Sequence, residues 1–440
     1  MSLVGTKTFV GIGFGAIQAG LFLYEAFRSG QFGRMVVAEV QTDLVRAIRG
    51  AEGWYSVNVA HLDGVEAVRV GPIEILDPAS EPDRARLREA LADADQIATA
   101  VPAVEYYVTE GPSSIHLLLA SGIQRKLSRH GSRAVVYAAE NHNHAAEILE
   151  TSVHRSLAEE ERMQARSNVQ FLNTVIGKMS GVIADPLEVG SLGLAPITPG
   201  QSRAFLVESF NQILISRISF PPHPDKTHFE RGILVFEEKD NLLPFEEAKL
   251  YGHNATHALA AYIGQLLGVR WIADLRNIPG IMPFLLASFV QESGEALIRK
   301  HQGTDVLFTP RGYEQYAEDL LLRMTNPFLR DTVERVGRDC ERKLAWDDRL
   351  IGTLRLALGQ GIAARRFSFG VAAALAGIDP SLLAEDGSAS PALLRAWGNA
   401  PGDPDEMASV LALVEEGLLR LRDWKKKGTP PLEEYFNPVS

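Results

Sequence analysis

The stretch Thr8-Phe-Val-Gly-Ile-Gly-Phe-Gly-Ala-Ile-Gln-Ala-Gly20 decides the fold class of the N-terminal half. Residues 8–13 are short and apolar, which is typical of a strand buried in a parallel sheet. Glycine-rich residues follow, and residues 19–28 then have the pattern of a helix. This order of strand, turn and helix presents backbone amides at a helix N-terminus, where they can bind a pyrophosphate.

Two registers of this turn fit part of the dinucleotide fingerprint. One uses Gly11, Gly13 and Ala16, and the other uses Gly13, Gly15 and Gln18. Neither register has all three glycines of G-x-G-x-x-G, and a glycine turn that serves only packing is the alternative. The strand before the turn and the helix after it favour a nucleotide site.

A carboxylate supports the same interpretation. Glu39 lies in the second apolar run, residues 35–40, and can accept hydrogen bonds from the ribose hydroxyls of a dinucleotide. Its negative charge would repel a 2′-phosphate. The expected cofactor is therefore NAD rather than NADP.

Short apolar runs alternate with helical patterns through the first half of the chain, which predicts a parallel sheet covered on both faces. After Pro244 helical patterns dominate. We expect an α/β Rossmann-type domain with extra antiparallel strands over residues 1–240, and a mostly α-helical domain over residues 241–440. The expected strands are residues 8–13, 35–40, 96–100 and 134–138, with antiparallel strands at 57–60 and 65–76 and a surface excursion at 379–405.

Composition excludes several classes of protein. The 440 residues carry a formal net charge of −11 and no long basic run, which argues against nucleic acid as a partner. Cys340 is the only cysteine, so the sequence allows no internal disulfide and no four-cysteine zinc site. We see no signal-peptide pattern and no membrane-length apolar run. The sequence therefore predicts a cytoplasmic protein without a membrane anchor, with a monomer as the favoured state.

The most informative segment is Glu246-Glu-Ala-Lys249-Leu-Tyr-Gly-His253-Asn254-Ala-Thr-His257. At about 100° per residue of a regular helix, Asn254 lies about 140° and His257 about 80° round from Lys249. These polar side chains are costly to bury on an otherwise apolar helix. A partly buried lysine whose pKa is lowered suits the removal of a proton from an alcohol, and amide or imidazole donors suit a developing alkoxide.

Two other interpretations of this helix remain open. His253 and His257 are four residues apart, the spacing of helical zinc ligands, although Asn254 stands where a hydrolytic glutamate is expected. A metal-dependent hydrolase or lyase is therefore the alternative class of enzyme. The residues could also be polar groups satisfied within a core.

The motif Lys249, four residues, Asn254, two residues, His257 resembles that of the polyol-specific long-chain dehydrogenases, the mannitol dehydrogenase family. The resemblance extends over most of the chain, and the C-terminal runs are most similar to mannitol-1-phosphate 5-dehydrogenases. The runs that carry it are 139–141 (AEN), 173–175 (NTV), 291–298 (QESGEALI), 326–338 and 342–351.

The resemblance implies a metal-independent NAD enzyme that interconverts a sugar alcohol and a ketose. It implies that Lys249 is the general base, that Asn173 and Asn254 stabilise the oxyanion, and that His257 binds a substrate hydroxyl. Glu246 could mediate proton movement, and Glu208 could face the polyol. The residues expected at the cofactor are Gly13, Gly15, Ala16, Ile17, Gln18, Glu39, Thr99, Ala100, Val101 and Asn141.

The sequence departs from the family at one place. The sugar-phosphate members resemble G-A-G-N-I-G-R-G in the turn, whereas Gln18 here replaces the third glycine and Ala19 replaces the arginine. This puts the cofactor contacts in doubt, and a degenerate nucleotide-binding protein is a further alternative.

A basic run bears on the substrate. Arginine and lysine recur between Arg335 and Arg349, and Arg335 and Lys343 are the expected phosphate ligands. A solvated helix with its own acidic partners is the alternative. The predicted substrate pair is mannitol 1-phosphate and fructose 6-phosphate, with an unphosphorylated polyol or a hexuronate as the other possibility.

Overall fold

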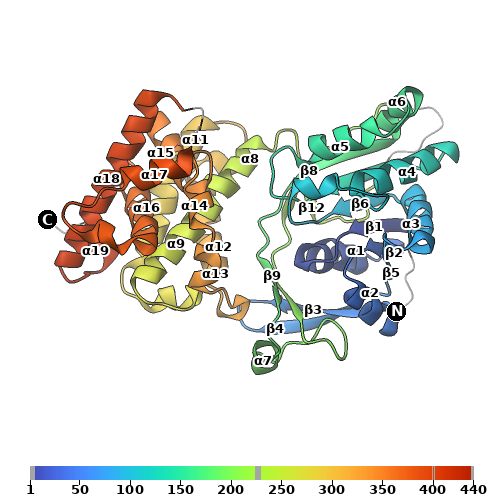
Figure 1. The fold of residues 1–440 in the computed structure, drawn as a ribbon, viewed down its shortest axis with the longest axis horizontal. Coiled ribbons are helices and arrows are strands. Elements are labelled where there is room, and N and C mark those ends of the chain that lie inside the picture. Colours follow the sequence, from blue (N-terminus) through green and yellow to red (C-terminus); the bar gives the residue numbers. More distant parts are fainter. Residues whose placement is uncertain (1–4, 223–228, 399, 401, 438–440) are drawn as a thin grey trace. The chain divides into compact units, whose positions relative to one another are not determined.

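The computed structural model describes residues 5–222, 229–398, 400 and 402–437. The chain forms two compact units, Met1–Leu243 and Pro244–Ser440 (Figure 1). The sequence pattern places this division between residues 240 and 241. Each unit is described by itself below.

The N-terminal unit is built on an eight-stranded sheet in which the strands nearest β1 are all parallel. Strand β11 is antiparallel to β8 and closes the parallel part at one side. A parallel centre with helical crossovers is the Rossmann-type arrangement expected from the alternating pattern. The strands in spatial order are β12 (Phe236–Lys239), β11 (Ile213–Ser216), β8 (Val169–Val175), β7 (Ala134–Ala138), β6 (Gln96–Thr99), β1 (Lys7–Ile12), β2 (Phe32–Ala38) and β5 (Glu74–Leu76).

A second sheet of four strands contains the expected antiparallel insertion. Strands β3 and β4 pair antiparallel, but the predicted strand over residues 65–76 is wrong in its second half, because Glu74–Leu76 joins β2 of the large sheet in parallel. The chain turns between these two parts at Gly71, whose φ of +140° favours glycine. The strands in spatial order are β4 (Val65–Val70), β3 (Tyr55–Ala60), β10 (Ala204–Glu208) and β9 (Ser180–Ile183).

Successive residues of β1 point to opposite faces of the large sheet and so enter two different cores. Phe9 belongs to the core under η1, α1, α2 and the small sheet, whereas Val10 belongs to the core under α3, α4 and α5. Both faces are therefore dry, which explains the continuous apolar sequence of this strand. The helices are η1 (Gln18–Phe22), α1 (Leu23–Ser29), α2 (Thr42–Gly50), α3 (Glu81–Asp93), η2 (Val104–Tyr107), α4 (Ile115–Ser128), α5 (Ala145–Arg155), α6 (Glu159–Asn168) and α7 (Pro186–Ser191).

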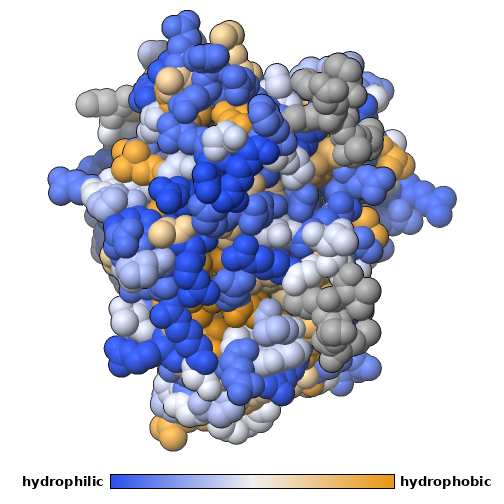
Figure 2. Space-filling model, turned by 90° about the vertical axis from the view of Figure 1, so that its right-hand side faces the viewer, coloured by the Kyte–Doolittle hydropathy of each residue, from blue (hydrophilic) through white to orange (hydrophobic). Residues whose placement is uncertain are grey.

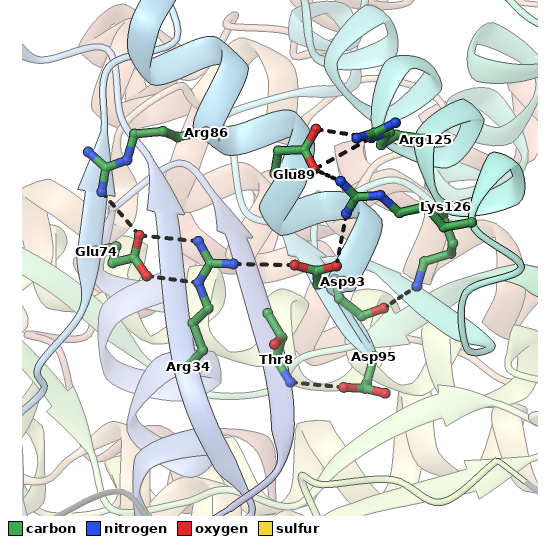
Figure 3. A network of polar contacts seen from close by, with 11 residues as sticks. Thr8, Arg34, Glu74, Arg86, Glu89, Asp93, Asp95, Arg125 and Lys126 are labelled. Carbon is green, nitrogen blue, oxygen red and sulfur yellow. Dashed lines mark hydrogen bonds and ion pairs between the residues drawn. The ribbon is translucent and has the colours of Figure 1, made fainter.

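Ion pairs connect α3 and α4 with the neighbouring strands (Figure 3). Arg34 of β2 pairs with Glu74 of β5 at 2.8 Å and reaches Asp93 at the end of α3 at 3.6 Å. Glu89 of α3 pairs with Arg125 of α4 at 3.1 Å. These side chains are about one third to one half exposed, so each pair contributes roughly 0–1 kcal/mol.

The C-terminal unit is helical. Helix α16 is buried over most of its length and packs against α9 and α18, so it forms the centre of this unit. The helices are α8 (Leu243–Glu247), η3 (Ala248–Asn254), α9 (Ala255–Leu266), η4 (Ile272–Asn277), α10 (Ile281–Ala287), η5 (Ser288–Gly294), α11 (Glu295–Lys300), η6 (Val306–Phe308), α12 (Pro310–Met324), η7 (Pro327–Leu329), α13 (Val333–Gly337), α14 (Cys340–Lys343), α15 (Arg349–Gly359), α16 (Arg365–Ile378), η8 (Pro380–Leu383), α17 (Ser390–Trp397), α18 (Pro404–Lys426) and α19 (Leu432–Phe436).

Two expectations for this unit need correction. Residues 379–405 are not simply a surface excursion, since they contain α17, which buries Leu393 and Trp397. The helical run Ile281–Lys300 is long and apolar enough to cross a membrane, contrary to the expectation that no run approaches this length. In the structure 61% of its apolar window is buried, as in a core helix.

Polar residues dominate the face of the molecule in Figure 2, and hydrophobic residues form smaller patches between them. Several large apolar side chains are nevertheless exposed, including Leu187 at 82% and Val306 at 77%.

Candidate functional site

The glycine turn of the N-terminal unit begins at Gly13. Gly11 lies inside β1, paired with β2 and β6, so the register with Gly13 and Gly15 is the one that forms the turn. Gly13 has φ +85°, and a Cβ there would lie 2.7 Å from the carbonyl oxygen of Ala100. Gly15 is exposed with nothing within 4 Å of a Cβ position, and the helix starts at Ala16. The turn thus leaves open backbone at a helix N-terminus, which fits a pyrophosphate.

Gln18 stands at the position of the third glycine, and its side chain points into the protein interior rather than into the turn. Its side chain is fully buried and packs over Gly11, where a Cβ would lie 2.1 Å from Nε2. Neither Nε2 nor Oε1 has a hydrogen-bond partner among the described residues. Gln18 is the first residue of the π-helical turn η1. Gln18 therefore changes the packing of strand and helix beneath the turn, and Ile17 beside it is partly buried.

Glu39 follows β2 and supports the turn. Its carboxylate accepts hydrogen bonds from the backbone N–H of Phe14 at 2.9 Å and of Gln41 at 2.7 Å. Each oxygen of a carboxylate has two acceptor positions, so both can accept a further donor. The residue is consistent with a ribose ligand and also has a structural role that the sequence pattern did not indicate.

A second buried carboxylate, Glu140, organises the edge next to the turn. It accepts from the Thr99 hydroxyl at 2.9 Å, from the Val101 N–H at 3.0 Å and from the Tyr107 hydroxyl. Burial raises the pKa of Glu140 despite these donors. Thr99 is therefore committed to the protein interior, whereas Asn141 is exposed.

Asn173 lies in β8 opposite Ala138, the last residue of β7, near the same carboxyl edge of the sheet. Its Oδ1 accepts from the N–H of Ala146 at 2.9 Å, and its Nδ2 donates to both carboxylate oxygens of Glu147, at 3.0 and 2.8 Å. The side chain is buried and joins the strand to the first turn of α5. Its expected part in stabilising an oxyanion stays a prediction.

Glu208 ends β10 of the small sheet and is 2% exposed. Its Oε1 accepts from the N–H of Met179 at 2.5 Å, and its main-chain carbonyl accepts from the ammonium of Lys178. These contacts connect β10 to the segment before β9. The expected contact with a polyol stays a prediction.

The predicted catalytic helix is not a regular α-helix. Residues Ala248–Asn254 form a π-helical turn, in which backbone hydrogen bonds join residues five apart. Lys249 and Asn254 are separated by one such step, so the angle of about 140° expected for a regular helix is wrong. Residues five apart in a π-turn stand closer together around the helix axis than in a regular helix, and His257 follows in the α-helical continuation α9. π-turns are often found at functional sites.

Lys249 is only partly exposed, and burial lowers the pKa of its ammonium to about 8. The positive charge of Arg349 lowers the pKa further, and the negative charge of Glu246 opposes both effects. An amine with a pKa near 8 exchanges protons at ordinary working pH, as a general base requires.

His257 is uncharged. Burial lowers the pKa of its imidazole to about 3, and the charges of Arg335, Arg349 and Lys343 act in the same direction. Its Nε2 lies 3.6 Å from Oδ2 of Asp331, and neither atom has a hydrogen-bond partner among the described residues. Asp331 also pairs with Arg335. A neutral imidazole beside a buried carboxylate can serve as a hydrogen-bonding group for a hydroxyl.

Basic side chains gather round this helix. Lys343 is 4% exposed, and burial, followed by the charges of Arg349 and Arg342, lowers its pKa to about 8. Its ammonium makes no hydrogen bond or ion pair with the described residues. Arg349 starts α15 and bonds Asp348 at 2.8 Å. Arg335 and Lys343, both predicted from sequence, therefore share one electrostatic environment with Lys249 and His257.

Sequence reasoning missed Arg349, Asp331 and Glu140 as parts of these sites. Arg349 and Asp331 stand in or beside the basic run, and Glu140 stands in the AEN stretch. Their positions were visible, but their contacts depend on segments distant in sequence.

A metal site finds no support among residues 5–222, 229–398 and 402–437, where no three His, Cys, Asp or Glu side chains could hold an ion. The rings of His253 and His257 are 6.4 Å apart. The histidine pair thus has no third ligand in that part of the chain.

Comparison with known proteins agrees with this arrangement. Residues 241–380 match the model of the mannitol dehydrogenase C-terminal domain. The whole fold is similar to a substrate-free D-sorbitol dehydrogenase, with 14% identity, a TM-score of 0.72 and coverage of 97% of this chain and 95% of that chain. It is also similar to the mannitol 2-dehydrogenase of Pseudomonas fluorescens in its ternary complex with NAD and D-mannitol, with 17% identity, a TM-score of 0.69 and coverage of 100% and 96%.

The α/β N-terminal unit and the helical C-terminal unit are those of these dehydrogenases. The family match includes Lys249, Asn254, His257 and the basic run. Over residues 241–380, the helical unit is therefore similar to the C-terminal domain of the mannitol dehydrogenase family.

Proposed function

We propose that this protein is an NAD-dependent polyol dehydrogenase that interconverts a sugar alcohol and a ketose, with Lys249 as the general base. The observation that carries the proposal is the lysine itself, whose pKa is lowered to about 8 on the same helix as Asn254 and His257. The family match and the NAD-bound mannitol 2-dehydrogenase of similar fold support it.

The N-terminal unit has the features that a dinucleotide needs. Gly13 and Gly15 leave the turn open, and Glu39 has acceptor capacity for ribose hydroxyls and repels a 2′-phosphate. When bound, NAD supplies a two-electron hydride acceptor for the carbinol carbon. The residues present therefore fit NAD. Ala100, Val101 and Asn141 follow strands β6 and β7 at the same edge, whereas Thr99 ends β6 with its hydroxyl bonded to Glu140.

In the oxidising direction the unprotonated amine of Lys249 takes the hydroxyl proton while the carbinol carbon loses its hydride. The alcohol thereby loses two electrons and becomes a ketone, and Lys249 later releases the proton to solvent. Asn254 donates to the developing alkoxide, which is worth on the order of 3 kcal/mol for a well-aimed donor. The neutral imidazole of His257 holds a neighbouring hydroxyl.

We further propose that the substrate carries a phosphate, as in mannitol 1-phosphate and fructose 6-phosphate. Lys343 is buried, and the positive charges of Arg349 and Arg342 outweigh the negative charge of Asp339 beside it. Arg335 and Arg349 also act on His257. An incoming dianion would supply the missing negative charge.

A substrate panel tests the proposal. NAD should be reduced with a polyol phosphate and NADH oxidised with a ketose phosphate, whereas mannitol, fructose and fructuronate should react poorly. Lys249→Met should abolish turnover while NADH fluorescence still reports binding. Equal activity with and without phosphate would reject the phosphate, and normal turnover of Lys249→Met would reject the mechanism.

Gln18 supports one second candidate, a degenerate nucleotide-binding protein, because it replaces the third glycine of the fingerprint and its buried amide has no hydrogen-bond partner among the described residues. NADH binding without turnover of any compound in the panel would favour it. A monomeric, cytoplasmic enzyme remains our prediction, and light scattering on the purified protein checks the monomer.

A further inference from the structure

Two π-helical turns pack against each other in the C-terminal unit. One is η3, which carries Lys249 and Asn254, and the other is η5, at Ser288–Gly294. A π-turn inserts one residue into a helix and is rare, so surrounding contacts must stabilise it against the regular helix. What holds η3 therefore decides where its side chains point.

Two aromatic rings fill the space between these turns. Phe289 of η5 and Tyr313 of α12 meet edge to face, with ring centroids 5.6 Å apart. Both residues are fully buried. The ring of Tyr316, also on α12, lies 5.6 Å from each of them, so the pair has little freedom to move.

Each π-turn presents a glycine to this pair. A Cβ on Gly252 would lie 2.4 Å from the Tyr313 hydroxyl and 2.6 Å from the Phe289 ring. A Cβ on Gly294 would lie 2.7 Å from the Tyr313 ring. Neither glycine has a positive φ. Their glycine character is therefore required by the close approach of the rings and not by backbone conformation.

We propose that Phe289 and Tyr313, seated between Gly252 and Gly294, hold the π-turn of η3 and thereby position Lys249 in line with Asn254. This inference rests on the proposed function of Lys249. Phe289 and Tyr313 are positioning residues, since they act through the helix and not on the substrate.

The charged and titratable groups round Lys249 come from several elements. Arg349 of α15 and Glu246 of α8 act on it, and His253 lies one turn further along η3. A change of register in η3 would move the ammonium relative to Arg349 and to solvent. Its titration is therefore a direct readout of the geometry, independent of substrate.

The test is Gly252→Ala. The protein is reductively methylated with ¹³C-formaldehyde, and the pH titration of Lys249 is followed by NMR. Its resonance is assigned from its loss in Lys249→Arg and separated from that of Lys343 with Lys343→Arg. The wild-type midpoint should lie near 8, and Gly252→Ala should shift it up by at least half a unit towards the ordinary value of 10.5. Turnover near pH 8 should fall at least tenfold, while NADH affinity stays within twofold.

Gly417→Ala is the matched control. Gly417 lies in α18, and a Cβ there would approach the Ser368 carbonyl oxygen to 2.4 Å, a crowding as severe as at Gly252. It should lower the melting temperature without moving the Lys249 midpoint. A shift of equal size in Gly417→Ala would overturn the proposal, because the effect would then follow from general destabilisation.

Two further variants keep the test decisive if Gly252→Ala does not fold. Phe289→Leu removes the ring without adding an atom, and it should raise the Lys249 midpoint in the same direction. Adding Tyr313→Phe to Gly252→Ala removes the nearest clashing atom and should restore part of the shift. An unchanged midpoint in Phe289→Leu would overturn the inference.

The two levels of proposal fail separately. If Lys249→Met abolishes turnover but the Lys249 midpoint ignores Gly252→Ala and Phe289→Leu, the aromatic pair has no positioning role and the proposed function stands. If those variants move the midpoint while wild-type protein turns over no polyol or ketose, the pair holds the turn and the proposed function fails.

Discussion

Lysines shielded from solvent occur in both units, and their surroundings differ. In the N-terminal unit Lys126 donates to the carbonyl oxygens of Ala94 at 2.7 Å and Ser132 at 3.1 Å (Figure 3), and Lys178 donates to those of Glu208 and Phe210. Carbonyl oxygens stabilise the charged ammonium. These two lysines therefore join backbone segments through their ammonium groups.

In the C-terminal unit Lys249 and Lys343 stand near Arg349, and the pKa of each is lowered to about 8. Burial and positive neighbours both favour the uncharged amine. The comparison teaches that burial alone does not make a lysine chemically active. Our hypothesis is that positive neighbours, together with burial, prepare Lys249 for proton transfer, whereas Lys126 and Lys178 serve the structure.

Replacement of Lys249 by methionine should impair catalysis far more than replacement of Lys126. Lys249→Met should lower kcat by about 10³-fold or more, within the range that a lost general base produces. Lys126→Met should leave kcat within a few fold at a temperature where it is folded. Steady-state kinetics on both variants measure this, and equal losses would remove the distinction.

The order should be reversed for stability, with Lys126→Met more destabilising than Lys249→Met. Lys126→Met removes the donor to the buried carbonyl oxygen of Ala94 and to the partly exposed one of Ser132, and it should lower the free energy of unfolding by about 1–3 kcal/mol. Lys249→Met removes a desolvated cation next to Arg349 and should leave stability unchanged or slightly higher. Denaturant unfolding measures both, and a large loss in Lys249→Met would show that this lysine too is structural.

Stability should depend on pH above neutrality. The folded-state pKa of Lys249 and Lys343 is about 8, below the ordinary 10.5, so the unfolded chain binds more protons between these values. The free energy of unfolding of the C-terminal unit should therefore rise as pH increases from about 8 to about 10.5. In Lys249→Met/Lys343→Met this rise should be largely absent, and a rise of full size in that double variant would assign it to other groups.

The smallest expected change in the free energy of unfolding comes from a partly exposed ion pair, Arg34–Glu74. Glu74 is about one third exposed, and its pairing with Arg34 lowers the pKa of its carboxyl. Glu74→Gln should lower the free energy of unfolding by only about 0.5 kcal/mol, with a smaller effect in high salt. A loss as large as that of Lys126→Met would mean that the network in Figure 3 acts as one cooperative unit.

Much of the fold was predictable because its signals are local. The apolar run over residues 8–13 predicted β1, and the run over residues 134–138 predicted β7 with the same bounds. The predicted strand over residues 65–76 failed because its last residues pair with β2, a partner that periodicity does not identify. The sequence also predicts an insertion over residues 221–229, of which residues 223–228 lie outside the described residues.

The sequence by itself determined the order of strands and helices, the glycine turn and the presence of Lys249, Asn254 and His257 on one helix. These depend on residue type and spacing along a continuous segment. Only the tertiary structure decided that the helix carries a π-turn and that Arg349 and burial lower the pKa of Lys249. The reason is that register and charge state depend on packing with segments far away in the chain, such as α12 and α15, which local periodicity does not encode.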